Sequence, residues 1–348
     1  MRARRFLSTS AAVAAVGLLA ACGSTGNAPD ANDTTNEPIE VAADGAFPLT
    51  IEHAFGETTI DAAPERVATV AWANHEVPLA LGIVPVGMAA ATWGDDDDNG
   101  VLPWVEDALA ALGADTPVLF DETDGIDFEG VAATEPDLIL ATYSGITEEE
   151  YQTLSQIAPT IAYPEVAWGT SYQDMITISS TALGLAEEGE ALIADLDAQV
   201  EAALAANPAL DGAKVLFSYI DPADFSQIGF YTSHDTRPGF LVDFGLPLPT
   251  VVTEETAGTD TFYVTVSAEE ADRFADVDLF VTYGDAGSDI VAQLQADPLL
   301  ATIPAIAEGR VAVLENSTPL AASANPSPLS IGWGVAEYLA LLAAPLAD

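Results

Sequence analysis

Short apolar runs alternate with helical patterns through the first half of the chain. Each run has the length and composition of a buried strand and is followed by a stretch with helical spacing. We predict strands at 67–72, 84–87, 117–120, 137–143 and 160–163, and helices near 79–81, 128–134 and 148–157. Such alternation is typical of an α/β lobe, in which helices connect the strands of a largely parallel sheet.

One long helical stretch interrupts this alternation. Between residues 171 and 208 the apolar side chains are spaced for one face of a helix, and proline is absent until Pro208. Gly184 and Gly189 could bend this helix or split it in two. After it, strand-like runs return at 214–219, 278–284 and 310–314.

The predicted fold class is therefore α/β, with two lobes that each contain a largely parallel central sheet and that are joined by a single long helix. The N-terminal lobe comprises residues 46–170, the linking helix 171–208 and the C-terminal lobe 209–348. The lobes also share a pattern: residues 128–143 and 268–283 each begin with a glutamate-led helix and continue with Asp-Leu opening a strand that ends in Thr-Tyr. This pattern suggests an internal repeat.

The first 45 residues have the features of an export signal and a tether. Three arginines within the first five residues precede an apolar run at 11–21, which is too short to span a bilayer. Leu-Ala-Ala-Cys at 19–22 resembles the bacterial lipobox, in which the cysteine is acylated. We therefore predict a signal peptide at 1–21, lipidation at Cys22 and a lipidated disordered tether at 22–45, because that segment has few large apolar residues. The acyl chains would hold the protein on the extracytoplasmic face of the cell membrane.

The composition limits the possible partners. The chain has 55 Asp and Glu against 8 Lys and Arg, and a formal net charge of −47. Nucleic acid binding requires a basic surface, so that class of partner is excluded. A negative field favours neutral or cationic ligands over polyanions, although adaptation to a salty habitat would produce the same acidic surface. Cys22 is the only cysteine, which excludes an internal disulfide.

Aromatic and polar side chains near the predicted strand ends are candidates for a ligand site. In open α/β sheets ligands bind beyond the carboxyl ends of the strands, where aromatic walls and a few polar groups hold them. Any single aromatic side chain there could equally belong to the core, so the prediction rests on the set. The candidates are Asn74, His75, Trp93, Tyr143 and Trp168 in the first lobe, and Tyr231, His234, Arg237, Tyr283, Asn325 and Trp333 in the second.

The sequence gives little support for a metal site or an active site. His53, His75 and His234 are the only histidines; the last two, in facing loops, could bind zinc or manganese with nearby carboxylates, but closely spaced further ligands are missing. The acidic run at 95–98 lacks the spaced ligands of a calcium loop. No nucleophile elbow or phosphate-binding loop is present. We predict no catalytic residue, no metal site and no cofactor, and keep a secreted hydrolase and a surface adhesion module as alternatives.

Five segments resemble the substrate-binding lipoproteins of ferric-siderophore ABC importers of actinobacterial type. They are 46–67, 72–88, 100–113, 135–142 and 317–339. The resemblance implies two lobes bridged by one rigid helix, a ferric siderophore in the cleft between them, and delivery of that ligand by a monomer to an ABC permease. Haem, cobalamin and direct metal-ion binding proteins with the same fold are the alternatives.

The resemblance also implies a docking surface, and the charges suggest a ligand type. In the family, one glutamate on each lobe pairs with arginines of the permease; the matching positions are Glu129 and Glu269, with Glu270 as the fallback. Ferric triscatecholates carry several negative charges and need clustered basic residues, whereas Arg237 is the one basic residue expected in the cleft. We therefore predict a neutral or cationic ferric hydroxamate such as a ferrioxamine.

Overall fold

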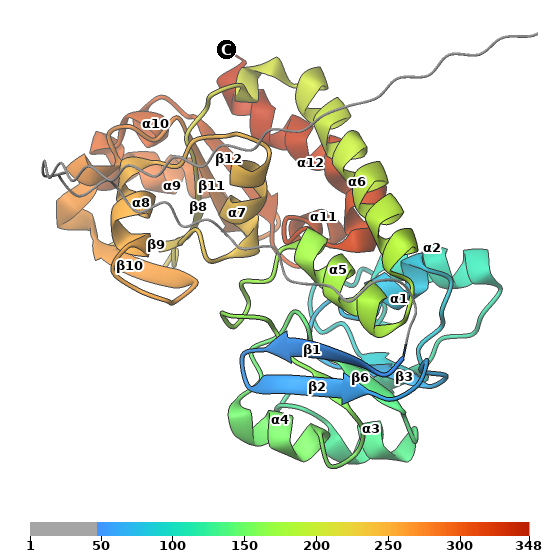
Figure 1. The fold of residues 1–348 in the computed structure, drawn as a ribbon. Helices are drawn as coiled ribbons and strands as arrows, with labels where there is room; N and C mark the ends of the chain where they lie inside the picture. Colours follow the sequence, from blue (N-terminus) through green and yellow to red (C-terminus); the bar gives the residue numbers. More distant parts are fainter. Residues whose placement is uncertain (1–46, 348) are drawn as a thin grey trace, which may run out of the picture. The chain divides into compact units, whose positions relative to one another are not determined.

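The computed structural model describes residues 47–347 (Figure 1). The predicted signal peptide, Cys22 and the tether lie outside this range. The first sheet is entirely parallel, as predicted, with strand order β5-β4-β3-β6-β7. Its strands are β3 (Val67–Thr69), β4 (Gly87–Ala89), β5 (Val118–Phe120), β6 (Leu138–Leu140) and β7 (Thr160–Ile161).

Both faces of the first sheet are covered. Leu138 and Leu140 point to one face, where they pack against the antiparallel hairpin of β1 (Leu49–His53) and β2 (Gly56–Ile60). Ile139 points to the other face and packs against α3 (Phe128–Ala133) and α4 (Glu148–Leu154). Burial on both faces explains why these parallel strands are continuous apolar runs. The lobe also contains α1 (Glu76–Ala80) and α2 (Pro103–Leu112).

The second sheet is mixed, with strand order β10-β9-β8-β11-β12. Its strands are β8 (Val215–Tyr219), β9 (Gln227–Tyr231), β10 (Tyr263–Ser267), β11 (Leu279–Gly284) and β12 (Val311–Glu315). Strands β8, β11 and β12 are parallel, as predicted, whereas β9 runs antiparallel to both of its neighbours. In both sheets the first strand along the chain lies in the middle, the second and third lie on one side of it, and the fourth and fifth lie on the other side.

The repeated sequence pattern corresponds to equivalent places in the two sheets. In the first lobe α3 precedes β6, and in the second the 3-10 segment η2 (Ala268–Phe274) precedes β11. Strands β6 and β11 each lie beside the first strand of their own sheet. The pattern therefore marks two copies of one helix–strand unit.

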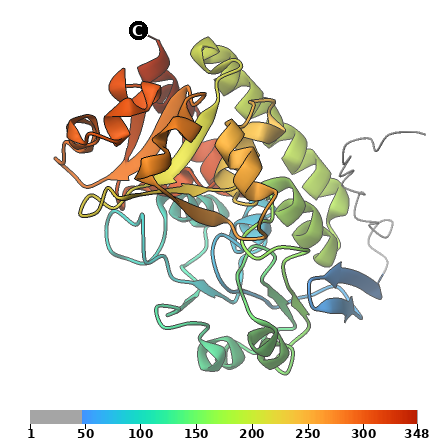
Figure 2. The ribbon, with the colours of Figure 1, turned by 90° about the vertical axis from the view of Figure 1, so that its left-hand side faces the viewer.

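Helices cover both faces of the second sheet (Figures 1 and 2). On one face Leu216 and Phe280 pack against η2 and helices α8, α9 and α10. On the other face Phe217 and Val281 pack against helices α6, α7 and α12. The helices are α7 (Thr236–Asp243), α8 (Thr250–Thr256), α9 (Ile290–Ala296), α10 (Pro304–Ala307), α11 (Pro319–Ser323) and α12 (Pro328–Ala343), with short 3-10 segments η1 (Pro208–Leu210), η3 (Leu300–Thr302) and η4 (Ala344–Leu346).

The predicted linking helix consists of two helices, α5 (Tyr172–Ala182) and α6 (Ala186–Ala206). Gly184 lies between them with a φ of +74°, a left-handed conformation that suits glycine and ends a helix. The structure thus shows a split at the first of the two glycines named above.

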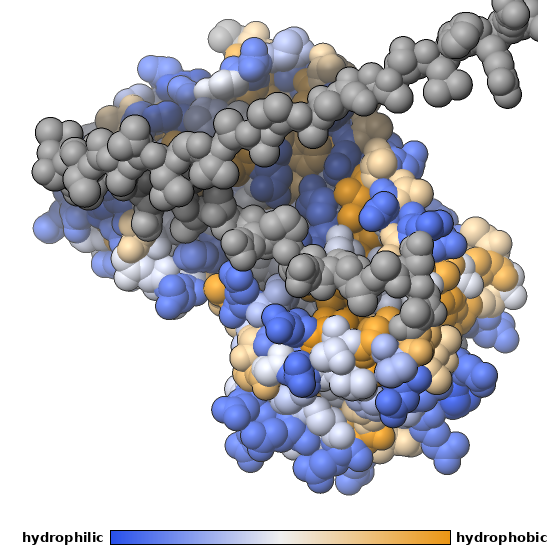
Figure 3. All heavy atoms as spheres, in the orientation of Figure 1, coloured by the Kyte–Doolittle hydropathy of each residue, from blue (hydrophilic) through white to orange (hydrophobic). Residues whose placement is uncertain are grey.

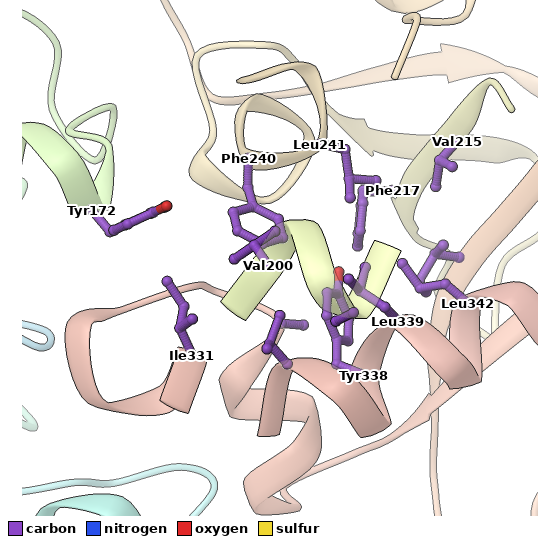
Figure 4. Packing of buried hydrophobic residues seen from close by; sticks show 14 of the residues in the cluster. Tyr172, Val200, Val215, Phe217, Phe240, Leu241, Ile331, Tyr338, Leu339 and Leu342 are labelled. Carbon is purple, nitrogen blue, oxygen red and sulfur yellow. The ribbon is translucent and has the colours of Figure 1, made fainter. Parts of the chain in front are cut away.

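Helix α12 packs along α6. Tyr338, Leu339 and Leu342 of α12 lie in the same buried cluster as Val200 of α6 and Phe217 of β8 (Figure 4). The segment Pro328–Leu346 is long and apolar enough to cross a membrane by length and composition alone. Its burial in this cluster accounts for that composition as a core helix. Elsewhere hydrophilic residues are common on the face shown in Figure 3.

Candidate ligand-binding site

Tyr143 lies at a junction between the two lobes. It follows β6 in the first lobe, and its hydroxyl lies 2.9 Å from Nδ2 and 3.1 Å from Oδ1 of Asn325, in the loop between α11 and α12. The same hydroxyl lies 3.3 Å from Oγ1 of Thr236 at the start of α7. Burial raises the pKa of Tyr143, so the hydroxyl remains a neutral hydrogen-bonding group.

Arg237 holds the second lobe's side of this junction together. Its Nη1 donates to both carboxylate oxygens of Asp235, at 3.0 and 2.8 Å, and its Nε donates to the Tyr283 hydroxyl at 3.1 Å. The guanidinium carbon lies 4.4 Å from the centre of the Tyr231 ring, in a cation–π contact. Asp235 thus balances the charge of Arg237 within the site.

Two tryptophans complete the set of contacts. Trp93 packs edge-on against Tyr283, with ring centres 6.0 Å apart, and Trp168 packs edge-on against Tyr143 at 5.4 Å. Seven predicted residues therefore make side-chain contacts in two groups, one of Trp93, Tyr231, Arg237 and Tyr283 and the other of Tyr143, Trp168 and Asn325, and we refer to them together as the aromatic cluster. Its members are Trp93, Tyr143, Trp168, Tyr231, Arg237, Tyr283 and Asn325.

The other predicted residues lie outside the aromatic cluster. The buried Asn74 amide donates to the carbonyls of Val70 and Tyr143 at 2.7 and 2.9 Å, so it fixes the backbone beside Tyr143. His234 Nε2 lies 3.0 Å from the Thr259 carbonyl oxygen. Trp333 packs against Trp104 with the two rings tilted relative to each other and their centres 5.2 Å apart. His75 lines a separate cavity.

That cavity, of about 300 Å³, lies in the first lobe beside the aromatic cluster. The loops that follow β3, β4, β5 and β6 surround it, which is the carboxyl edge of the parallel sheet. Trp168 lines the cavity and also contacts Tyr143, so the two features adjoin. The apolar lining includes Trp72, Met88, Ile126, Ile146 and Trp168, and the polar lining includes His75, Thr92, Glu122 and Glu150.

Two polar atoms in this lining, Oε1 of Glu122 and Nδ1 of His75, are buried without a hydrogen-bond partner among residues 47–347. The other Glu122 oxygen accepts from the backbone N–H of Ala71 at 2.9 Å. Burial raises the pKa of Glu122 to about 7 and lowers the pKa of His75 to about 4. The histidine is therefore neutral at ordinary pH, and the glutamate titrates near neutrality.

Backbone strain gathers around the same cavity. Ala71, Ala73 and Trp168 adopt left-handed φ angles of +60°, +61° and +62°, and all three line it. Non-glycine residues persist in this conformation only where the surrounding contacts enforce it, and such residues cluster at functional sites. For Ala71 one enforcing contact is the hydrogen bond to Glu122.

Of the basic residues within 47–347, only Arg237 belongs to the aromatic cluster. Lys214 pairs with Asp276, Arg273 with three glutamates, and Arg310 with Asp278 and Glu308. Arg66 donates to the carbonyls of Thr134 and Glu135, which precede β6. Within the same range, no three His, Cys, Asp or Glu side chains are grouped so that they could hold a metal ion.

Some site residues were not identified from the sequence. Asp235 and Thr236 precede Arg237, and Asp235 caps α7 by accepting from the Arg237 backbone N–H at 2.9 Å. That helix start is a recognisable signal. Glu150 carries a similar signal, because Thr147 and Glu150 form the capping box at the start of α4, but that signal marks a helix start and not a cavity lining. Glu122 carries no such signal, because an acidic residue in an acidic chain looks like ordinary surface.

A family model described as periplasmic binding protein matches residues 67–318. The crystal structure of Streptococcus pneumoniae TIGR4 PiaA in complex with ferrichrome is 47% identical in sequence, with a TM-score of 0.81, over 85% of this chain and 98% of PiaA.

Two curated proteins of Bacillus subtilis (strain 168) are also similar. Probable siderophore-binding lipoprotein YfiY is 30% identical over 43% of this chain and 43% of its own length. Fe(3+)-citrate-binding protein YfmC is 24% identical over 74% of this chain and 75% of its own length. The chain thus spans less than half the length of YfiY.

Proposed function

Because this chain belongs to the periplasmic binding protein family, we propose that it captures a ferric siderophore and delivers it to the permease of an ABC importer for iron uptake. The observation that carries the proposal is the aromatic cluster, which joins both lobes through side chains suited to a large, partly apolar ligand. PiaA, which matches over nearly its whole length, was solved with ferrichrome. The family and these neighbours are substrate-binding proteins, which favours binding over turnover.

The charges in the site favour a ferric hydroxamate. Arg237 is paired with Asp235, so the aromatic cluster offers no free positive charge to a polyanionic complex. Glu122 and Glu150 add acidic groups to the adjoining cavity. A ferric triscatecholate would meet these carboxylates without compensating cations, at a substantial electrostatic cost. Neutral and cationic ferric hydroxamates avoid this cost, and the ferrichrome bound by PiaA is a hydroxamate.

Two exposed glutamates are candidates for docking to the permease. Glu129 lies in the first turn of α3, and Glu269 lies at the start of η2. Within residues 47–347 neither side chain has a hydrogen-bond or ion-pair partner, whereas Glu270 pairs with Arg273 at 3.3 Å. This difference favours Glu269 over Glu270 as the contact in the second lobe.

We propose that the protein acts as a lipid-anchored monomer on the extracytoplasmic face of the membrane. The support is the Leu-Ala-Ala-Cys motif that ends at Cys22 and the lipoprotein naming of YfiY. Cys22 lies outside the described residues, so the anchor is inferred from the sequence alone.

Mass spectrometry of compounds that copurify with the protein from an iron-starved culture tests the proposed ligand. We expect a ferric hydroxamate that is recovered from the protein chemically unchanged. Copurification of haem or cobalamin would move the protein to another ligand class of the same fold. Conversion of the bound compound into a product would support an enzyme instead.

A further inference from the structure

The cavity beside the aromatic cluster has polar groups that the capture of an iron centre does not use. Two of the five buried side-chain atoms without a partner in the described residues, Glu122 Oε1 and His75 Nδ1, line this one cavity. His75 is only 6% exposed, so its ring is almost wholly enclosed. A buried polar atom without a partner is costly, and two such atoms in one cavity point to a ligand with hydrogen-bond donors.

The size of the cavity indicates which part of a ligand enters it. At about 300 Å³ it lies at the lower end of the range for small-molecule sites. A whole ferric trihydroxamate needs more room, whereas an alkyl arm ending in a small polar group fits. The apolar walls, which include Met88, Ile126 and Ile146, suit the methylene groups of such an arm.

The polar lining indicates the chemistry of the arm's end. Glu122 Oε1 is a free acceptor, and a neutral His75 offers Nδ1 as a second acceptor in the tautomer that carries its proton on Nε2. Glu150 adds another carboxylate to the lining, and Asp127 on the neighbouring helix contributes further negative potential at Glu122. Acceptors and carboxylates together match a group with several N–H donors and a positive charge.

We infer that this cavity is a subsite for a primary ammonium, so that the protein selects a siderophore whose iron complex carries an alkylammonium arm. The arm would lie along the apolar wall and place its ammonium against Glu122 Oε1. This inference rests on the proposed function, because it assigns the adjoining aromatic cluster to the ferric hydroxamate centre.

The carboxylate must be ionised to bind an ammonium strongly. The pKa of Glu122 is about 7, raised by burial and then by Asp127 and Glu150, while His75 stays neutral above pH 5. Preference for the ammonium should therefore increase as pH rises from 5.5 to 8.5, and binding near pH 6.5 should release a proton. Alkylammonium groups remain charged throughout this range.

The test compares two ligands that differ only at the end of the arm, where one carries the ammonium and the other an uncharged amide. Ferrioxamine B, a linear ferric trihydroxamate ending in a primary ammonium, and its N-acetyl derivative are titrated calorimetrically into wild-type protein, Glu122→Gln and Glu149→Gln. Glutamine keeps an acceptor for Ala71 but removes the charge, and Glu149 is an exposed residue of α4 that serves as the matched control.

We expect wild type and Glu149→Gln to prefer the amine form by about tenfold to a hundredfold at pH 8, and Glu122→Gln to lose most of that preference. If Glu122→Gln fails to fold, the pH dependence of the wild-type preference decides instead. Equal affinity for both ligands at every pH would overturn the ammonium subsite and leave the proposed function intact. Failure of both complexes to bind would overturn the subsite together with the hydroxamate assignment.

Discussion

The Arg237–Asp235 pair is the most enclosed ion pair in the described residues, with side chains 17% and 2% exposed. Each charge is tolerated in that environment because the other is present. The pair also fixes the guanidinium between Tyr231 and Tyr283. It therefore serves both stability and the geometry of the aromatic cluster.

Replacing Asp235 with asparagine should strongly destabilise the protein. The change leaves the Arg237 charge buried without its partner, at an expected cost of about 3 to 5 kcal/mol in the free energy of unfolding, measured by denaturant titration. The control is Glu254→Gln, whose carboxylate is 59% exposed and pairs with Arg273. That change should cost about 1 kcal/mol or less. Similar losses in the two variants would show that the buried pair has no special role.

Glu122 should make the ligand-free protein less stable at high pH. Its pKa is raised from 4.5 to about 7 on folding, so the folded state binds the proton more tightly than the unfolded state. The resulting stability is fully present below pH 4.5 and is lost as pH rises through 7, by at most about 3 kcal/mol and less with solvent screening.

The variant Glu122→Gln should therefore show a flatter pH dependence of the unfolding free energy between pH 5 and 8, and should be more stable than wild type at pH 8. Glu149→Gln is the control and should follow the wild-type curve. A Glu122→Gln curve parallel to that of wild type would show that this carboxyl has an ordinary pKa in the folded protein.

The sequence predicted these residues unequally. The aromatic residues and Arg237 are recognisable as candidates because large rings and a rare basic residue stand out in an acidic chain. Asn74 stays a predicted ligand contact; in the fold its side-chain amide donates to the carbonyls of Val70 and Tyr143. Glu122 was missed because its importance arises from burial, which the loop sequence does not reveal.

At the scale of elements, the parallel strands were predictable because burial on both faces makes them continuous apolar runs. Strands β9 and β10 were missed. Only Val266 of β10 is buried, and the Gly229 backbone in β9 lies against the Tyr263 side chain, so neither strand has the continuous apolar pattern. Because these two strands are not recognisable in the sequence, the antiparallel pairing on this side of the second sheet could not be predicted.

The break between α5 and α6 can be tested by a pair of glycine substitutions. Gly184 and Gly212 have similar left-handed φ angles of +74° and +69°. A Cβ at Gly184 would lie 2.9 Å from the Phe47 ring, whereas one at Gly212 would have no atom within 4 Å.

Gly212→Ala should cost only the left-handed strain, about 1 to 2 kcal/mol. Gly184→Ala should cost about 1 kcal/mol more in the unfolding free energy, because the Phe47 ring must move as well. Equal losses would show that Phe47 does not constrain the break.

For the whole molecule, the docking proposal predicts a defect in transport without a defect in ligand binding. The double variant Glu129→Ala with Glu269→Ala removes two exposed carboxylates that have no partners among residues 47–347, so folding and ligand affinity should change little. Uptake of iron from the ferric ligand by cells should fall, since charged rims steer encounter and orientation. The matched control is Glu149→Ala with Glu337→Ala, which removes from each lobe one exposed carboxylate that has no partner among residues 47–347. Equal uptake in both double variants would argue against docking through Glu129 and Glu269.

The two-lobe arrangement was largely predictable from one interruption of an alternating pattern, whereas the contacts that join the lobes were not. Tyr143, Thr236 and Asn325 are far apart in the sequence, and only the fold brings them together. The packing of α12 along α6 likewise depends on residues that read simply as an apolar helix.

Calorimetric titration of the purified protein with two ferric complexes of different charge tests the central claim most directly. The complexes are ferrichrome, a neutral ferric trihydroxamate, and ferric enterobactin, a trianionic triscatecholate. Because Asp235 already neutralises Arg237 and the cavity is acidic, we expect saturable binding of ferrichrome in the micromolar range or tighter and no measurable binding of ferric enterobactin. Tight binding of ferric enterobactin without binding of any ferric hydroxamate would contradict the account.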